Sequence, residues 1–378
     1  MQGITEMRFE KMVVKKKKME FEVSGVDISI INSLRRTVLA DLKNVGFYFN
    51  ATEHSDNPST IIEQNDTPLH NEFMMHRISM IPIHVSKEEL EDWDNYGYMF
   101  EIDVVNKTGE LKNITSGDFV VYSKDGVMLP KSTASRLFPI DPITKDHILI
   151  TKLNKNMDSK LIVKAMAIVS TAKSSVSFGL VSKCSFELVV DEKQAGKALE
   201  KLLEEAEESK HHDIKGNFKN LNRDRHYRKN KYLEADLFKI SIESECSIHC
   251  IDIYSIAIRH LKESFSNMMD KNYKIENNMS FMTIIIPIGS HTTGNMLQAI
   301  CFNRLIRENI DNTFGLTYIG YNIPHPLEQT MLIKVKGDDL VTIDDTITLF
   351  RDMLKIVIEE LEQFENQWII FSSKYKKT

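Results

Sequence analysis

Two stretches of this chain place an apolar residue at alternating spacings of four and three. The longer series runs through Ile343, Ile347, Phe350, Leu354, Val357, Leu361, Phe364 and Trp368. The shorter series runs through Tyr254, Ile258, Leu261, Phe265 and Met268. This spacing puts every apolar side chain on one stripe of a helix, and such a stripe packs lengthwise against another helix. Because neither stripe can remain in water, each helix requires a partner.

The passages that lead into the two stripes align with each other. An offset of 93 matches Ile242 with Val335 and Asp252 with Asp345. An earlier helical segment, "INSLRRTVL", aligns with "GNMLQAICF" at an offset of 263. The two offsets differ by 170, so the first copy contains that many residues that the second copy lacks.

A duplicated unit with two apolar seams predicts a chain that pairs with itself. We expect an α+β fold in which two related strand-helix-strand-helix dimerisation modules form an intramolecular pseudo-dimer. A mainly β insert domain interrupts the first module. The expected boundaries are 1–50 with 181–270 for the first module, 51–180 for the insert domain and 271–378 for the second module.

The first module begins with an extended segment. Met19, Phe21 and Val23 alternate with polar residues, which is typical of a half-buried strand. Asp27 then caps a helix that is expected over residues 27–45. The apolar face of this helix carries Ile31, Leu34, Val38 and Leu42.

Residues 209–231, "SKHHDIKGNFKNLNRDRHYRKNK", are basic and show no apolar period, so we expect a loop. Two interpretations remain open for it: a solvated connection, or a contact with nucleic acid or a partner protein. The net charge of the whole chain is −6. That balance argues against a general nucleic-acid binder, because such proteins carry a basic excess.

The four cysteines contain no C-x-x-C pair, and Cys246-His249-Cys250 is the nearest approach to a ligand cluster. We therefore expect free, mostly buried thiols in a reducing compartment, with no structural metal and no cofactor. No run of about 18 apolar residues occurs, so no membrane span is expected. The N-terminus has no signal-peptide pattern.

The stretch "SHTTGNML" begins at Ser290 and precedes a helical pattern. Its polar side chains can accept from the free N–H groups of the first helical turn, and Gly294 allows close approach of the backbone. A phosphate could bind the same N-terminus, as in a phosphate-binding hydrolase. Because no glycine-rich loop with a lysine is present, we favour a structural helix start with His291 as a hydrogen-bonded residue. No carboxylate cluster suited to catalytic magnesium occurs, so no magnesium-dependent catalytic centre is expected.

Two pairs of polar residues are candidates for contacts with a partner. Arg35 and Arg36 are adjacent, so their side chains point about 100° apart on a helix. At least one is expected to face outward, where a guanidinium binds carboxylates or carbonyl oxygens. Glu72 and His76 lie one helical turn apart and are expected as a hydrogen-bonded pair rather than half of a metal site.

Several of these segments resemble the α-like assembly subunits of cellular RNA polymerases. The N-terminal two thirds are similar to the third subunit of eukaryotic polymerase II and to its archaeal counterpart, through "NSLRR", "HNEFMMHRISMIPIHV" and "DHILITKLNKNMDSKLIVKAMA". The C-terminal third is similar to the eleventh subunit of polymerase II and to the corresponding small archaeal protein, through "SHTTGNML" and "YIGYNIPHPLE". The likeness covers nearly the whole chain. One chain with both parts resembles the fused arrangement in large cytoplasmic DNA viruses.

The resemblance implies a non-catalytic scaffold of a DNA-directed RNA polymerase, which docks the largest, second-largest and small polymerase subunits for transcription. It implies no membrane, no small-molecule substrate and little or no direct nucleic-acid contact. The implied location is the virion and host cytoplasm for a viral protein, and otherwise the nucleus or cytoplasm. A free-standing protein or nucleic-acid adaptor is the alternative.

The resemblance also implies two sets of site residues. The residues expected at surfaces that dock other subunits are Asn32, Arg35, Arg36, Glu72, His76 and Arg77. The residues expected at the dimerisation interface are Ile31, Leu34, Val38, His291, Gly294, Asn295, Leu297, Tyr254, Leu261, Phe350, Leu354 and Leu361.

Two features depart from the family. Relatives often carry a cysteine-rich metal site in the insert, whereas this chain has no cysteine before Cys184. A lysine-histidine-alanine-lysine stretch of the family appears here as "AKSSVSFGLV", so the contacts made there are not carried over to this chain.

Overall fold

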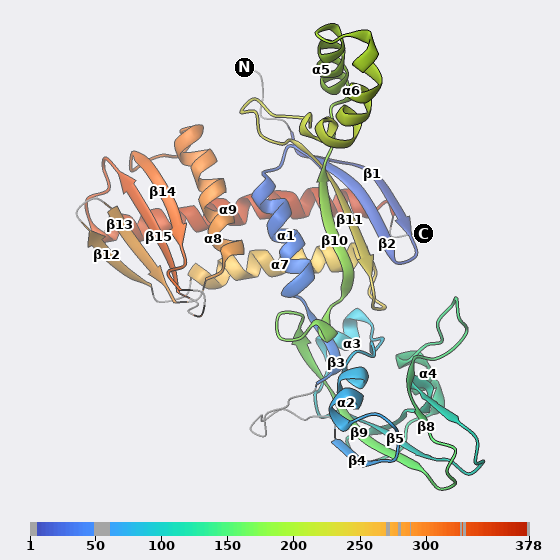
Figure 1. Ribbon diagram of the computed structural model, residues 1–378. Coiled ribbons are helices and arrows are strands. Elements are labelled where there is room, and N and C mark those ends of the chain that lie inside the picture. Colours follow the sequence, from blue (N-terminus) through green and yellow to red (C-terminus); the bar gives the residue numbers. More distant parts are fainter. Residues whose placement is uncertain are drawn as a thin grey trace. The chain divides into compact units, whose positions relative to one another are not determined.

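The computed structural model describes residues 6–48, 61–269, 273–278, 281–287, 289–325, 327 and 330–375. The chain divides into two compact units (Figure 1). Unit 1 consists of Met1–Val38, Lys183–Glu243 and Cys250–Thr378. Unit 2 consists of Leu39–Ser182 and Ser244–His249. The stretch expected as an insert domain, 51–180, belongs to unit 2, and both expected modules contribute to unit 1.

The first module of unit 1 is an antiparallel sheet with two helices. The strand order is β1-β2-β11-β10. Met19, Phe21 and Val23 on β2 are buried, as their alternation predicts. The elements are β1 (Arg8–Lys15), β2 (Lys18–Ser24), α1 (Ile28–Ala40), β10 (Val181–Leu188), β11 (Leu237–Ser244) and α7 (Cys250–Met269).

The second module repeats this plan. Its strand order is β12-β13-β15-β14, which is the first module's order element for element. Helix α8 continues into the π-helical turn η6. The elements are β12 (Lys274–Asn278), β13 (Phe281–Ile286), α8 (His291–Cys301), η6 (Phe302–Arg307), β14 (Leu316–Asn322), β15 (Met331–Gly337) and α9 (Ile343–Ser372).

The structure confirms the duplication at the residue level. The first residues of the long helices, Cys250 and Ile343, stand 93 positions apart, the same offset as in the sequence alignment. The N-terminal caps of the opening helices, Asp27 and Ser290, stand 263 apart. Each module has four strands, two more than the predicted strand-helix-strand-helix plan counted: a hairpin partner, β1 or β12, and an outer strand, β10 or β14.

A helical excursion connects β10 with β11 in unit 1. It contains α5 (Glu192–Glu204), η3 (Glu208–Lys210), α6 (His211–Asn217), η4 (Phe218–Asn222) and η5 (Arg223–Arg225). The prediction of a loop over 209–231 was therefore wrong in its first half. Phe218 is buried and stacks on His226 at 5.5 Å between ring centroids. The π-helical turn shifts the register, which hides the 3.6-residue period in the sequence.

Unit 2 is mainly β, with short helices at its surface. Its five-stranded sheet has the order β3-β9-β5-β7, with β4 also paired to β9, and β6 pairs with β8. The strands are β3 (Lys43–Phe47), β4 (Ile61–Asn65), β5 (Tyr98–Val105), β6 (Lys112–Thr115), β7 (Val120–Ser123), β8 (Leu149–Leu153) and β9 (Lys160–Thr171). The helices are α2 (Asn71–Ser79), α3 (Lys87–Glu91), η1 (Ser116–Asp118), α4 (Lys131–Leu137) and η2 (Val176–Phe178).

The first predicted helix is shorter than expected. It ends at Ala40, and β3 occupies the positions assigned to its last turn. Val45 and Phe47 enter the core of unit 2, and Gly46 lies against the ring of Phe178. Pairing with β9 therefore overrides the helical period, and Leu42 is not part of the helical face.

Candidate functional site

Helices α7 and α9 join the two modules of unit 1. The side chains of both predicted seams are buried except Ile343, which is half exposed, and Ile347, which is partly buried. Ser255 accepts a hydrogen bond from the indole of Trp368 (2.9 Å), whereas Lys262 binds Glu365 (2.6 Å). The partner number on α9 falls as the number on α7 rises, so the helices are antiparallel. Figure 1 shows the two helices side by side.

Aromatic rings close one end of this seam. Tyr254 and Trp368 meet edge-on at 4.8 Å between centroids, and Phe21 of β2 lies 5.1 Å from Trp368. Phe9 of β1 packs at 5.1 Å from Phe364. Rings of the first module thus surround the C-terminal part of α9. The area that they bury contributes more than any polar contact in the seam.

The opening helices also meet across the modules. Ser33 of α1 donates to the carbonyl of Thr292 on α8 (3.2 Å), and Arg36 donates to the Thr292 hydroxyl (2.8 Å). Asn303 donates to Asp27 (2.8 Å), the cap of α1. The start of each helix lies toward the end of the other. This reciprocal arrangement is what a pseudo-two-fold axis between two copies of a module produces.

A polar rim surrounds the junction. Arg307 holds Glu234 through two nitrogens (2.9 and 2.8 Å) and lies 4.5 Å over the ring of Tyr232. The hydrogen bonds from Arg307 lower the pKa of Glu234. The half-buried Glu360 behaves in the opposite way, since burial raises its pKa.

The start of α8 is a capping box. Ser290 accepts from the Thr293 backbone N–H (3.2 Å), and the Thr293 hydroxyl accepts from the Ser290 N–H (3.2 Å). A Cβ on Gly294 would stand 2.5 Å from the ring of Tyr321 and 2.8 Å from the sulfur of Met331. The glycine therefore permits the close crossing of α8 over its own sheet. The helix uses its own hydroxyls at this end, which favours the structural interpretation over a phosphate cradle.

The predicted interface residues divide into two groups. Ten of the twelve are buried within unit 1: Ile31, Leu34, Val38, Tyr254, Leu261, Gly294, Leu297, Phe350, Leu354 and Leu361. His291 and Asn295 are exposed, and the His291 ring lies 3.4 Å from the hydroxyl of Tyr321 in its own module. Adjacent residues of a helix point in different directions, so Thr292 meets α1 while His291 does not.

The arginines expected to dock a partner have different surroundings. Arg35 is half-buried and donates twice to Asn32 on its own helix (3.1 and 3.0 Å). Arg36 is exposed but its Nε is committed to Thr292. Arg35 is therefore held against its own helix, whereas Arg36 supports the junction between the modules.

Helix α2 carries the remaining predicted docking residues within unit 2. Glu72 and His76 are exposed one turn apart. Arg77 donates to the carbonyls of Ile150 (2.7 Å) and Leu149 (2.9 Å), so it fastens the helix to β8.

Phe73 was not among the predicted docking residues, although it is 65% exposed beside Glu72. The buried side of α2 is marked by Met74 and Ile78. An aromatic residue that the helical period places away from this side was the available signal in the sequence.

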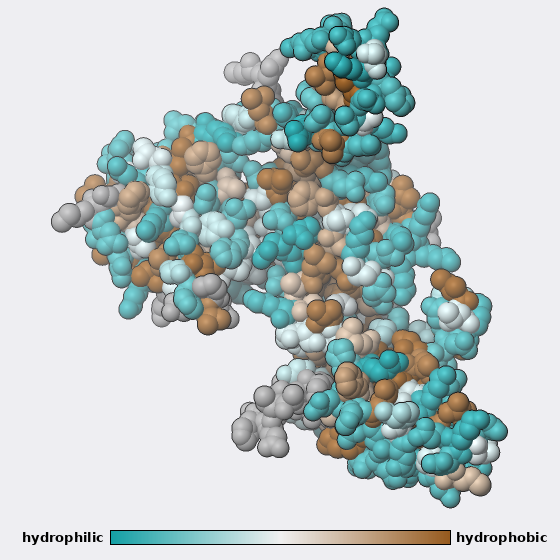
Figure 2. All heavy atoms as spheres, viewed as in Figure 1, coloured by the Kyte–Doolittle hydropathy of each residue, from teal (hydrophilic) through white to brown (hydrophobic). Residues whose placement is uncertain are grey.

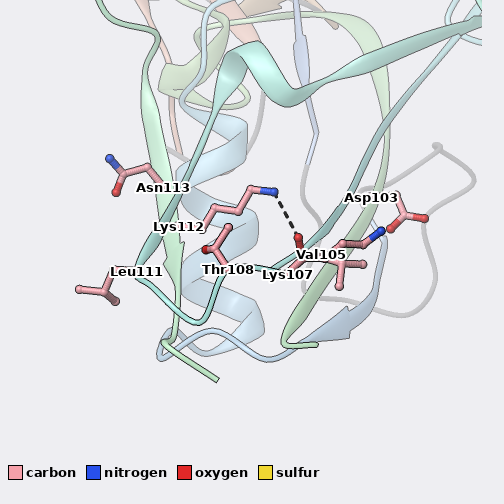
Figure 3. Close-up of a pocket in the computed structure, with 7 residues that line it drawn as sticks. All are labelled: Asp103, Val105, Lys107, Thr108, Leu111, Lys112 and Asn113. Atoms are coloured by element: carbon pink, nitrogen blue, oxygen red, sulfur yellow. Dashed lines mark hydrogen bonds between the residues drawn. The ribbon is translucent and has the colours of Figure 1, made fainter. Parts of the chain in front are cut away.

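A shallow hollow of about 600 Å³ lies on unit 2, between β5 and β6 (Figure 3). Asp103, Lys107, Thr108 and Lys112 are among its lining residues. Lys112 donates to the carbonyl of Val105 (3.2 Å), and Lys160 pairs with Asp103 (3.1 Å). The Thr108 hydroxyl donates to the side-chain oxygen of Asn106 (3.0 Å), so it is not paired with a basic group that would activate it as a nucleophile.

All four cysteines are buried free thiols, as predicted. Burial raises the pKa of Cys184 to about 12, which makes it a poor metal ligand or nucleophile. Within the described ranges, no group of three His, Cys, Asp or Glu residues is placed to hold a metal ion. The same part of the chain contains no helix that is long and apolar enough to cross a membrane.

Two family models match the chain, and both are described as the RNA polymerase Rpb3/Rpb11 dimerisation domain. One matches residues 20–265 and the other residues 282–367. The second match therefore falls within the second module, without β12 and the end of α9. The first match falls within the first module and unit 2, without β1 and the end of α7.

The chain is also similar to curated RNA polymerase subunits, at identities of 24–27%. "DNA-directed RNA polymerases IV and V subunit 3B" of Arabidopsis thaliana is 25% identical over 183 residues, which are 44% of this chain and 53% of the relative. Human "DNA-directed RNA polymerases I and III subunit RPAC1" is 24% identical over 206 residues, 49% of this chain and 56% of the relative. "DNA-directed RNA polymerase subunit Rpo3" of Thermococcus kodakarensis is 27% identical over 133 residues, 31% and 48% respectively. The chain spans about half the length of the curated relatives it matches.

Proposed function

Because the chain belongs to the RNA polymerase Rpb3/Rpb11 dimerisation-domain family, we propose that it is the assembly scaffold of a DNA-directed RNA polymerase. In this role it catalyses no reaction itself. It provides the platform on which the largest and second-largest subunits dock, together with small polymerase subunits.

The observation that carries the proposal is the paired topology of unit 1. Two sheets of identical strand order are joined by α7 against α9 and by α1 against α8. Both family matches fall in one chain, so a dimer of two such modules is complete within a single polypeptide. The plant, human and archaeal relatives are polymerase subunits by name, which supports the same role here.

We assign docking to two surfaces, each considered by itself. On α1, the Asn32–Arg35 pair offers a guanidinium that is held in position by its neighbour. On α2, Glu72, Phe73 and His76 present an aromatic side chain flanked by polar groups, a combination typical of interface anchors. Partner carboxylates or carbonyl oxygens would suit the first surface.

Purification of the tagged chain from its native source tests this function. The expected result is recovery of two very large subunits in stoichiometric amounts. Recovery of the chain alone, or with unrelated proteins only, would contradict the scaffold role and favour a free-standing adaptor.

Variants then test the docking surfaces in the same assay. Arg35→Glu should reduce recovery of one large subunit strongly, because a complementary contact becomes a like-charge contact. Glu72→Lys combined with Phe73→Ala should do the same through α2. Lys334→Glu, at an exposed position of β15, is the matched control and should leave recovery unchanged. Equal recovery in all variants would remove both surfaces from the proposal.

The fused arrangement motivates a narrower proposal, a viral polymerase located in the virion and host cytoplasm. Mass spectrometry of purified particles from the source tests it. Detection of this chain together with large polymerase subunits is expected, and their absence from particles would contradict the viral setting.

A further inference from the structure

The helical excursion between β10 and β11 concentrates positive charge. Residues 209–231, termed here the basic hairpin segment, contain five lysines, three arginines and two aspartates. Their net charge of +6 contrasts with −6 for the whole chain. Figure 2 shows a mainly hydrophilic surface over α5 and α6. The scaffold role does not require such a segment.

Half of these cations are already paired with carboxylates. The paired cations and their acids are Lys210 with Glu207, Arg223 with Glu192, Arg228 with Asp236 and Lys231 with Glu308. The other four are exposed and form no ion pair with the described residues: Lys215, Lys219, Arg225 and Lys229. These four charges are not neutralised by a described carboxylate, although Lys229 lies over the ring of Tyr227.

The helical geometry aligns two of the available cations. Ile214 is half-buried and Phe218 is buried, so they mark the packed side of α6 and η4. Lys215 and Lys219 follow them by one residue each and lie about 6 Å apart along the axis, on a neighbouring face. Like charges at this spacing destabilise a helix by a few tenths of a kcal/mol, so the arrangement is not explained by folding.

The adjacent helix does not neutralise this face. Residues 192–208, which include α5, carry six glutamates and three lysines. Only Glu192 and Glu207 of these form ion pairs with the basic hairpin segment among the described residues. The two signs of charge are therefore segregated along the excursion.

Backbone hydrogen bonds hold the base of the excursion. The amide of Asp191 donates to the carbonyl of His226 (2.8 Å), and the amide of Arg228 donates to Val189 (3.0 Å). The amide of Asp236 donates to Arg228 (3.1 Å). Arg225 and Lys229 flank these bonds, so their backbone positions are fixed relative to the sheet.

We infer that the basic hairpin segment binds the phosphate backbone of duplex nucleic acid without regard to sequence. We expect the phosphate oxygens to be contacted by the four cationic side chains and by the side-chain amides of Asn217, Asn220 and Asn222. An acidic protein partner would require an apolar or aromatic anchor. Phe218 is buried and Tyr227 lies under Lys229 (5.0 Å), so neither ring is presented as one. Leu221 is 67% exposed, but a single aliphatic side chain between Asn220 and Asn222 offers little apolar area beside four cations.

This inference revises the expectation of little or no nucleic-acid contact. The net charge of the whole chain, −6, argued against nucleic-acid binding, but it sums the +6 of the basic hairpin segment with the negative charge of the other residues. The inference does not depend on the scaffold function, because the full chain alone can be tested.

Fluorescence anisotropy tests this inference. The full chain is titrated against a labelled 30-base-pair duplex DNA of mixed sequence at salt concentrations between 50 and 200 mM. Four phosphate contacts give a slope of about −3.6 for log K against log salt, a loss of roughly 150-fold over this range. The test variant carries Lys215→Gln, Lys219→Gln, Arg225→Gln and Lys229→Gln. The control carries Lys107→Gln, Lys131→Gln, Lys145→Gln and Lys152→Gln, which remove the same charge from exposed positions of unit 2.

The expected result is salt-dependent binding that falls at least tenfold in the test variant at 50 mM salt and is retained by the control. Thermal melting shows that both variants are folded. Equal loss in both variants, or no binding at 50 mM, would overturn the inference. Poly-glutamate is tested in the same way. If its binding depends on these four residues and duplex binding does not, the surface belongs to an acidic protein partner. Tighter binding to single-stranded RNA than to the duplex would also overturn it.

Discussion

Gly294 lies where α8 crosses two strands of its own sheet. A methyl group there would stand 2.5 Å from Tyr321 and 2.8 Å from Met331, closer than real carbon contacts allow. We predict that Gly294→Ala lowers the free energy of unfolding by about 1–3 kcal/mol, because the helix must move away from the sheet. Thermal melting measures the change.

Gly196→Ala is the matched control for that substitution. Gly196 lies inside α5, and a Cβ atom at this position would have no neighbouring atom within 4 Å. The methyl group should raise helix stability by about 0.5–1 kcal/mol. If both variants melt alike, the close approach at Gly294 is not a packing constraint.

Glu360 gives a prediction about pH. Burial raises its pKa most, Arg304 opposes the rise, and Asp27 and Glu308 add to it. The folded chain therefore holds this proton more tightly than the unfolded chain, so stability falls as pH rises through the folded pKa. Glu360→Gln should raise the melting temperature at pH 7, and the gain should shrink toward about pH 4, where the carboxyl is mostly protonated even in the unfolded chain.

Glu362→Gln, on the exposed side of the same helix, is the control for this pH dependence. It should not reproduce the stabilisation at pH 7. A melting difference for Glu360→Gln that is the same at pH 4 and pH 7 would show that the carboxyl charge is not its cause.

At the scale of elements, the long helices were the most predictable part of the fold. The residues at spacings of four and three were correctly predicted to be buried, because one continuous face of each long helix packs against one other helix. The short elements were less predictable. Residues 43–45 were assigned to the first predicted helix but form the start of β3, and the π-helical turn at 218–222 obscures the period of α6. Tertiary pairing decides these cases, and it leaves little trace in local sequence.

The seam itself is tested by a charge placed inside it. Leu354 is fully buried in α9, whereas Ile343 is half exposed at the first turn of the same helix. Leu354→Asp should lower the free energy of unfolding by at least about 3 kcal/mol, since it removes apolar contacts and buries a carboxylate. Ile343→Asp should change it little, because an acidic residue suits a helix N-terminus. Urea titration compares the two, and equal effects would argue against the seam.

At the scale of the whole molecule, the duplication explains why the pairing of the two modules could be predicted from the sequence. The two matching seams predicted that α7 meets α9, and the resemblance placed residues of α1 and α8 at the same interface. The sequence could not show that Arg36 reaches Thr292, or that His291 faces its own module. These details depend on the direction in which each side chain leaves its helix, which the crossing of the two helices sets.

The proposed docking residues of α2 came from the resemblance alone, apart from Phe73. Glu72 and His76 carry no distinguishing pattern, and Phe73 became a candidate once its exposure was known. The helical period shows that these side chains lie away from the buried side of α2, but it cannot show that a partner binds them.

Closure of two copies of one module on each other, within one chain, is the central claim made for this protein. Lys262 of α7 and Glu365 of α9 are in contact at 2.6 Å, and both are partly accessible. Replacing both with cysteine and treating the chain with a short bis-maleimide at nanomolar concentration tests the claim directly, with the single-cysteine variants as controls. We expect a monomer-sized product in which peptides of α7 and α9 are linked, with a yield independent of protein concentration. Links that appear only between chains, and increase with concentration, would contradict the claim.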